Sequence, residues 1–274
     1  MFTLCAFADE AYPQLDKQIT ALTENEITHL EIRGVDGQNI SEITAEQAKE
    51  ARRKLDASGI KVWAIGSPTG KIKIDEPFYT HLESFRHMLE LADILGASHY
   101  RLFSFYGTSD RSEGIVIQLL SEFLKAAEGS SITLCHENEK GIFGDIADRC
   151  VRIHNQLPQI KAVFDPANFV QCNQDTAEAW EMLKPYVEYV HIKDSLSDGS
   201  IVPAGKGIGN LEMILSEFSA MGGGTLTIEP HLHVFDGLKD LENDSNESLV
   251  GKKYSYPSPR AAFDAACGAL KTLI

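Results

Sequence analysis

The sequence lacks the features that mark secreted, membrane-spanning or disulfide-stabilised proteins. Its five cysteines are odd in number and none belongs to a Cys-x-x-Cys pair, which argues against a disulfide framework and against a thiolate zinc site. No apolar run approaches the roughly 20 residues that a membrane-spanning helix needs. The N-terminal segment has no basic region and reaches an acid at Asp9, so it predicts a first strand and not a signal peptide. We therefore expect a cytoplasmic protein without a membrane partner.

Positive charge is also scarce. The chain has 40 acidic and 25 basic side chains, a formal net charge of −15, and its basic tracts are as short as Arg52-Arg53-Lys54. Proteins that bind a nucleic-acid backbone need clustered Lys and Arg to neutralise its phosphates. A nucleic-acid partner is therefore not expected, although a local basic pocket for one small anion is compatible with this charge. The sequence leaves the oligomeric state open, including a homo-oligomer.

What the sequence does contain is a regular alternation of strand and helix patterns. Near-continuous apolar runs, typical of parallel strands buried on both faces, alternate with segments whose apolar residues recur every 3.6 positions. The expected strands cover residues 2–8, 28–33, 61–66, 99–105, 131–137, 161–165, 187–192 and 225–229. The last helix is expected to start at Ser258-Pro259. Eight such units predict an α/β fold, a single (β/α)8 TIM barrel that forms one domain over residues 1–274.

One long irregular stretch, from about residue 231 to 257, follows the eighth expected strand directly. It contains an acidic and polar run over residues 240–247. Long loops in compact domains are usually either functional or disordered. Two interpretations therefore stay open, a surface excursion and a lid over the rim of the barrel.

Four successive strands, the fifth to the eighth, end in side chains that can bind a metal: Glu137, Asp165, His191 and Glu229. Taken singly, an acid at a strand end is usually a helix cap or an ion-pair partner, and a histidine within a strand is usually a hydrogen-bonded core residue. Taken together, they should meet at the rim where barrel enzymes build their active sites. Acids gathered there would repel one another unless a cation joined them. This oxygen and nitrogen set suits one divalent ion, Mn, Mg, Co, Fe or Zn, and His191 should donate its other ring nitrogen to an acceptor behind it.

With these residues in view, the chain resembles the xylose-isomerase-like TIM-barrel family of sugar phosphate isomerases and epimerases. This superfamily also includes ketose 3-epimerases, hydroxypyruvate isomerase, inosose dehydratase and, distantly, endonuclease IV. The resemblance covers nearly the whole chain. The matching motifs are Glu137-Asn138, Asp165 with Asn168, His191-Ile-Lys-Asp194, the turn Gly205-Lys-Gly-Ile-Gly209, and Glu229.

The resemblance implies that Glu137 and Glu229 are both metal ligands and the catalytic acid–base pair, with Asp165 and His191 completing the metal site. One glutamate would take a proton from the carbon next to a sugar carbonyl, and the other would return it from the opposite face. A divalent metal would stabilise the enediolate formed between the two steps.

Further polar residues near the same rim are candidate substrate contacts. They are Glu31 and Arg33 after the second strand, Lys71 after the third, Asn168 in the Asp165 motif, Lys206 in the glycine turn, and His231 after Glu229. Many barrels bind phosphate at the position of that turn, which includes Lys206. Each of these residues also has a plain structural interpretation as an ion-pair partner or part of a tight turn.

The chain departs from the ketose 3-epimerases at three positions. Ser197, Phe143 and Asn168 stand where those enzymes usually carry Arg, Glu and His, which argues against a free ketohexose as substrate. The sequence thus predicts a metal-dependent isomerase or epimerase of a small sugar, sugar acid or sugar phosphate. A polyol-ketone dehydratase of the inosose type would use the same proton abstraction and then expel hydroxide.

Two rival functions belong to different classes of protein. An endonuclease IV-like phosphodiesterase needs extra histidines and a basic DNA track, so the acidic charge and Asn168 argue against it. A noncatalytic barrel that only binds ligands would keep the fold alone, and the intact set of four metal-binding side chains argues against it. The sugar, its reacting stereocentre and the native metal stay open at this point.

Overall fold

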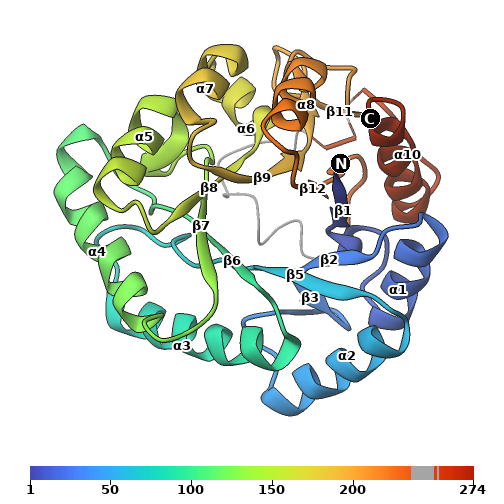
Figure 1. Ribbon diagram of the computed structural model, residues 1–274, viewed down its shortest axis with the longest axis horizontal. Helices are drawn as coiled ribbons and strands as arrows, with labels where there is room; N and C mark the ends of the chain where they lie inside the picture. The colour runs from blue at the N-terminus through green and yellow to red at the C-terminus, as the bar shows by residue number, and fades with distance from the viewer. Residues whose placement is uncertain (236–249, 252) are drawn as a thin grey trace.

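Eight parallel strands close into a barrel in the computed structural model, which describes residues 1–235, 250–251 and 253–274 (Figure 1). The strands are β1 (Thr3–Ala6), β2 (His29–Ile32), β5 (Lys61–Gly66), β6 (His99–Leu102), β7 (Thr133–Glu137), β8 (Lys161–Phe164), β9 (Val187–Ile192) and β12 (Thr225–Ile228). Each strand pairs with its neighbours, and β1 closes the ring by pairing with both β2 and β12. The predicted barrel is confirmed, and every expected strand is present within or close to its predicted limits.

Helices surround the barrel on the outside (Figure 1). They are α1 (Leu15–Glu24), α2 (Ala45–Ala57), α3 (Phe78–Leu95), α4 (Glu113–Ala126), α5 (Ala147–Gln156), α6 (Pro166–Gln171), α7 (Thr176–Leu183), α8 (Leu211–Ala220) and α10 (Pro259–Lys271). Short 3-10 helices occupy η1 (Ala8–Glu10), η2 (Asp110–Ser112) and η3 (Phe143–Asp145). Two small hairpins, β3 (Gly34–Val35) with β4 (Gln38–Asn39) and β10 (Asp194–Ser195) with β11 (Ile201–Val202), follow strands β2 and β9.

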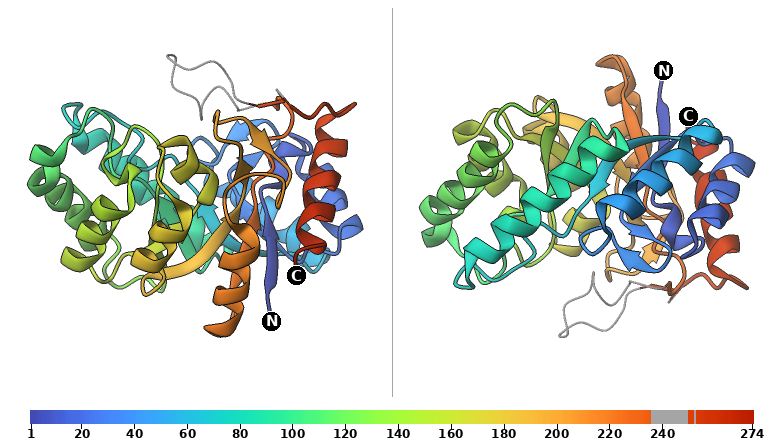
Figure 2. Two further views of the ribbon diagram at one scale, coloured as in Figure 1. Left: turned by 90° about the horizontal axis from the view of Figure 1, so that it is seen from above. Right: turned by 90° about the horizontal axis from the view of Figure 1, so that it is seen from below.

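The two ends of the chain lie close together, and α10 packs beside α1 (Figures 1 and 2). The start of α10 follows the sequence signal, since the Ser258 hydroxyl accepts a hydrogen bond from the amide of Ala261 and proline occupies the first turn. Asn25, just after α1, donates to Asp264 on α10 at 2.7 Å. This contact helps to close the outer ring where the first and last βα units meet.

The apolar faces of the helices pack on the outer face of the barrel. Along α3 the buried residues Leu82, Phe85 and Met88 recur at helical spacing, as the stripe in the sequence predicts. Inside the barrel, the buried ring of Phe7 follows β1 and meets the ring of His191 edge-on at 5.4 Å. An aromatic ring therefore packs directly against one of the metal-binding side chains.

The long loop predicted after the eighth strand falls mainly on residues 236–249 and 252, which lie outside the described residues. Its two interpretations therefore stay predictions. The segment before it turns inward at the rim, because Leu232 and Phe235 are both buried. Within the described part of the chain, none of the helices combines the length and apolar character needed to cross a membrane.

Candidate metal centre and active site

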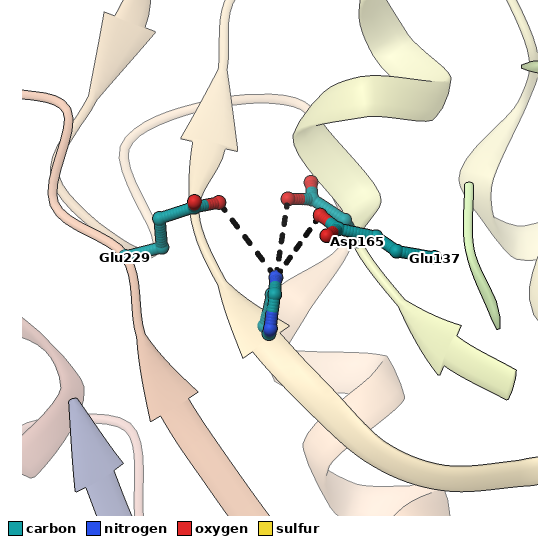
Figure 3. Close-up of side chains that lie close together, drawn as sticks. Glu137, Asp165 and Glu229 are labelled. Carbon is teal, nitrogen blue, oxygen red and sulfur yellow. Dashed lines mark hydrogen bonds and ion pairs between the residues drawn. The ribbon is translucent and has the colours of Figure 1, made fainter. Parts of the chain in front are cut away.

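The four metal-binding side chains predicted from the sequence meet at the carboxyl-terminal rim of the barrel (Figure 3). Glu137 is the last residue of β7 and His191 lies near the end of β9, while Asp165 and Glu229 directly follow β8 and β12. His191 Nδ1 lies 3.1 Å from Glu137 Oε1, 3.7 Å from Glu229 Oε2 and 3.9 Å from Asp165 Oδ2. One donor atom from each of the four lies within 4.8 Å of the others, and all four residues are buried.

The local sequence explains how Asp165 can be a helix cap and a metal ligand at once. Its Oδ1 accepts a hydrogen bond from the amide of Asn168 at 2.9 Å and caps α6, whose first residue is Pro166. Its Oδ2 remains directed into the cluster. The ordinary interpretation of this acid as a cap and its role in the cluster are therefore compatible.

These residues fit a divalent cation. Among the described residues, Glu137 Oε2 and Asp165 Oδ2 are buried oxygens without a hydrogen-bond donor. Each has a basic side chain nearby, Arg101 for Glu137 and Lys193 for Asp165. Burial raises the pKa of Asp165 to about 7; Lys193 opposes this shift, whereas Glu229 and Glu137 add to it. A divalent ion would relieve this repulsion, and three carboxylates with one imidazole are ligands that such ions accept. The cluster could thus hold one divalent metal ion.

The acceptor expected behind His191 is Glu31. His191 Nε2 lies 3.2 Å from Glu31 Oε2, and the other carboxylate oxygen of Glu31 accepts from the Tyr189 hydroxyl at 3.0 Å. Burial disfavours a charged ring, but Glu137 and Glu31 outweigh it and raise the pKa of His191 to about 10. The sequence suggested Glu31 as a substrate contact. The structure places it behind the ring, fully buried and apart from the residues that line the cavity.

Each of the two candidate catalytic glutamates has an arginine of its own. Arg101 Nη1 lies 3.1 Å from Glu137 Oε2, and Arg33 Nη1 lies 3.3 Å from Glu229 Oε1. Both guanidinium groups also pack on the ring of Phe7, with 4.4 Å from Arg33 Cζ and 5.2 Å from Arg101 Cζ to its centroid. Arg33 was a candidate substrate contact. Its guanidinium group also contacts the carboxylates of Asp9 and Glu10, and Arg33 is not among the residues that line the cavity.

These neighbours set the charge of the two glutamates. Burial alone would raise the pKa of Glu137, but His191 and Arg101 lower it below its usual value. Burial would likewise raise the pKa of Glu229, but Lys193 and other cations, including Arg33, hold it well below its usual value. Both glutamates are therefore kept as carboxylates, the form that can accept a proton or bind a metal.

Sequence reasoning did not assign a role to two basic residues of this site. Lys193 Nζ lies 2.8 Å from Asp165 Oδ2 and 2.7 Å from Glu229 Oε2, so it joins two of the metal-binding carboxylates. The sequence feature that could have identified Lys193 is its position two residues after His191. Side chains two residues apart in an extended chain point to the same face. Arg101 also had a signal, because it is a charged residue within an expected strand, residues 99–105.

A cavity opens above the four metal-binding side chains. It is lined by Lys71, Arg101, Phe103, Glu137, Glu139, Lys140, Asn168, Gln171, Lys193, Ile201, Glu229, His231 and Val250. Three predicted substrate contacts, Lys71, Asn168 and His231, thus lie on its wall. Asn168 Nδ2 lies 3.3 Å from Glu137 Oε1, while the amide of His231 donates to Glu10 at 2.7 Å. Asn168 is therefore placed to orient Glu137 as well as to contact a ligand.

The glycine turn does not present free amides to a phosphate. The amides of Gly205, Gly207 and Gly209 donate to the carboxylate of Asp194 at 2.9 to 3.0 Å. A Cβ at Gly207 would lie 2.2 Å from Asp194 Oδ1, so close packing around this carboxylate requires glycine there. Lys206 is exposed on this turn and does not line the cavity, so its predicted contact with substrate stays a prediction.

Several solved structures have the same fold. The probable 3-DHS dehydratase AsbF from Bacillus anthracis is 14% identical, with a TM-score of 0.72 over 99% of both chains. A D-psicose 3-epimerase from Clostridium cellulolyticum H10, solved with D-tagatose, is 14% identical, with a TM-score of 0.71 over 99% of this chain and 98% of the other. A xylose isomerase-like TIM barrel protein from Mycobacterium smegmatis in complex with magnesium is 16% identical, with a TM-score of 0.69 over 94% and 87% of the two chains.

At these identities the structural likeness establishes the fold alone. No curated protein matches the sequence significantly. The family is established independently, because residues 20–249 match the family model described as Xylose isomerase-like TIM barrel. The resemblance inferred from the sequence motifs is therefore confirmed, and the chain belongs to the xylose isomerase-like TIM barrel family.

Proposed function

We propose that the protein is a divalent-metal-dependent isomerase or epimerase of a small sugar, sugar acid or sugar phosphate. The observation that supports this best is the pair of buried glutamates, Glu137 and Glu229, that approach one metal-binding cluster from different sides (Figure 3). Proton transfer next to a carbonyl needs a base and an acid at one carbon, and these two carboxylates line one cavity.

The chain's own residues then have distinct roles. Glu137, oriented by Asn168 and kept ionised by Arg101, would remove the proton from one face of the substrate carbon. Glu229, held at the cluster by Lys193 and Arg33, would enter this step in its protonated form and return that proton from the other face, which gives epimerisation; exchange with solvent then restores the starting protonation of both glutamates. Return of the proton to the neighbouring carbon would give isomerisation instead. A divalent ion held by these two glutamates, Asp165 and His191 would supply Lewis acidity for the substrate carbonyl.

Solvent deuterium uptake tests this proposal directly. Metal-free protein, reloaded with Mn²⁺, is incubated in deuterium oxide with a panel of small ketoses, sugar acids and sugar phosphates. The proposal predicts a conversion that leaves the mass of the product unchanged apart from deuterium at the reacting carbon. A chelated sample should show neither conversion nor exchange. Metal-loaded protein that converts no member of the panel and promotes no exchange would count against the proposal.

A dehydratase of a polyol ketone is the second candidate, and the position of Lys193 favours it. The ammonium group lies within 2.8 Å of two carboxylate oxygens of the cluster and lines the cavity, where it could protonate a departing hydroxide. The initial proton abstraction would be the same. The products separate the two candidates, because a dehydratase releases one water and its product is lighter, whereas isomerisation and epimerisation preserve the mass.

A further inference from the structure

The cavity of this acidic protein is richer in basic than in acidic side chains. Across the chain, acids outnumber Lys and Arg by 40 to 25. Among the described residues, the cavity wall reverses this relation, with four basic residues against three carboxylates. The basic residues are Lys71, Arg101, Lys140 and Lys193, and the acids are Glu137, Glu139 and Glu229.

Most of these carboxylates are already committed to the metal-binding cluster. Glu137 and Glu229, with Asp165 beneath them, supply the oxygens that would hold a divalent ion. Counting Asp165, the basic and acidic groups of the cavity balance. A bound divalent ion would therefore leave an excess of positive charge on the wall of the cavity, facing any molecule that enters. In a partly enclosed site such an excess favours an anionic ligand over a neutral one.

Lys71 is the basic group best placed to receive an anion away from the cluster. It lies in the segment after β5 and is mostly buried, with 9% of its side chain exposed. Its ammonium group sits 4.4 Å from the centroid of Phe103, which keeps one side of it away from water. Glu139, from the segment after β7, holds the ammonium at 3.2 Å. This carboxylate–ammonium contact thus joins the two segments at the cavity.

The carboxylate of Glu139 occupies the position at Lys71 that an anionic ligand would take. Its Oε2 accepts from Lys71, and its Oε1 accepts from the backbone amide of Lys140 at 2.9 Å. Glu139 is itself partly exposed, at 15% of its side chain, so it can turn toward water. An incoming carboxylate or phosphate would meet the same ammonium group, and charge-assisted hydrogen bonds of this kind are stronger than those between neutral groups.

We infer that the substrate of the proposed reaction is an anionic polyhydroxy carbonyl compound, whose carboxylate or phosphate binds Lys71 while its reacting carbon lies at Glu137 and Glu229. This inference rests on the proposed function and narrows its substrate class. Neutral sugars are then poor ligands, because they would leave Lys71 with Glu139 and gain nothing from the positive charge of the metal-loaded cavity.

Binding of unreactive probes to the Mn²⁺-loaded full chain tests this by calorimetry. Glucitol is the neutral probe, and gluconate and glucitol 6-phosphate are its carboxylate and phosphate counterparts. None of them carries an aldehyde or ketone group, so turnover does not interfere. At least one charged probe should bind roughly tenfold more tightly than glucitol. Whichever charged probe binds more tightly identifies the kind of anion that the site prefers.

Two variants with opposite expected effects make the test specific for Lys71. Lys71→Met should bring the charged and neutral probes to nearly equal affinity while Mn²⁺ affinity is retained. Glu139→Gln removes the competing carboxylate and should raise the preference for the charged probe by several fold. A loss of structure would weaken both kinds of probe in both variants and would not produce changes of opposite sign.

Equal affinity of wild type for all three probes, or no measurable binding of either charged probe, would overturn the inference. A preference that persists in Lys71→Met would do the same. The proposed function fails in a different way, if the chain binds no divalent metal or if turnover does not depend on Glu137 and Glu229. A result in which metal binding and proton exchange are present and neutral sugars are preferred therefore removes only the substrate assignment.

Discussion

His191 and Glu31 come together from opposite parts of the sequence, with Nε2 of the ring 3.2 Å from Oε2 of the carboxylate. In this contact the N–H group at Nε2 donates a hydrogen bond to Glu31. His191 can then present Nδ1 to the metal-binding cluster. Tyr189 fixes the carboxylate from the other side through its hydroxyl. A carboxylate behind a metal-binding histidine sets the orientation of the ring and raises its strength as a ligand.

We therefore predict that Glu31→Gln weakens the binding of Mn²⁺ or Zn²⁺ by about 10–100-fold, the usual cost of losing such a partner. Glutamine has the size of glutamate but lacks its charge, so the ring loses its anionic acceptor. Isothermal titration with each metal measures the change. Tyr189→Phe is the matched control, because it removes a neutral hydrogen bond to the same carboxylate and should cost less. Unchanged metal affinity in Glu31→Gln would mean that the contact does not support the metal site.

The sequence predicted the barrel and the four metal-binding side chains because both depend on local pattern. Buried parallel strands are apolar on both faces, so their limits can be read from runs such as the one that ends at Glu137. Barrel topology then brings the carboxyl ends of all the strands to one rim, whatever their separation in sequence. These two rules are enough to bring Asp165, His191 and Glu229 together with Glu137 without any knowledge of side-chain contacts.

The partners of these residues could not be predicted in the same way. Arg33 and Glu229 are 196 positions apart, and no local pattern connects them. Their contact depends on where two long side chains end, and the guanidinium group of Arg33 packs on Phe7, a third residue far from both in sequence. In the glycine turn a local pattern was present but misleading. The pattern is typical of a phosphate site, yet amides of the turn already donate hydrogen bonds to the carboxylate of Asp194. The preceding acid was visible in the sequence and was the missing signal.

Glu137→Gln and Glu229→Gln should each reduce turnover by about 10²–10⁴-fold, the range expected when general acid–base catalysis is lost. Glutamine keeps the size and one oxygen donor but cannot act as a base near neutral pH. Loss of metal could produce the same decrease, so metal content must be measured on the same samples. A double variant with full metal occupancy and a near-normal rate would exclude both glutamates from the proton transfer.

Lys193→Met should strengthen metal binding. The ammonium group lies 2.7 Å from Glu229 Oε2 and 2.8 Å from Asp165 Oδ2, two oxygens that would also bind the metal. Repulsion between like charges at such distances amounts to a few kcal/mol in a partly buried site. In the wild type the lysine side chain can move away and relieve part of this repulsion. Its removal should therefore increase metal affinity by roughly tenfold.

Titration of metal-free protein with Mn²⁺ measures this change. Lys71→Met is the matched control, because Lys71 lines the same cavity but is bound to Glu139, and its loss should leave metal affinity within about twofold. Weaker metal binding in Lys193→Met would assign Lys193 the opposite role, that of holding the two carboxylates in place.

Stability should fall as the pH drops below about 6.5, and His154 is one identifiable cause. The ring lies in α5, where Nδ1 donates to the carbonyl oxygen of Ile160 at 3.0 Å, while the buried Nε2 has no partner among the described residues. A proton added at Nε2 would thus have neither water nor an acceptor. Burial accordingly lowers the pKa of His154 from 6.5 to about 4, although its bond to Ile160 opposes the shift.

The direction of the pH effect follows from this shift. Between pH 6.5 and about 4 the unfolded chain binds a proton at His154 that the folded chain does not, so the free energy of unfolding decreases as the pH falls. At pH 5 this residue should cost about 2 kcal/mol relative to pH 7. His154→Gln retains a hydrogen-bond donor but does not titrate, so its loss of stability between pH 7 and 5 should be smaller by about that amount. Urea unfolding at several pH values measures both curves, and parallel curves across this range would show that His154 does not contribute to acid sensitivity.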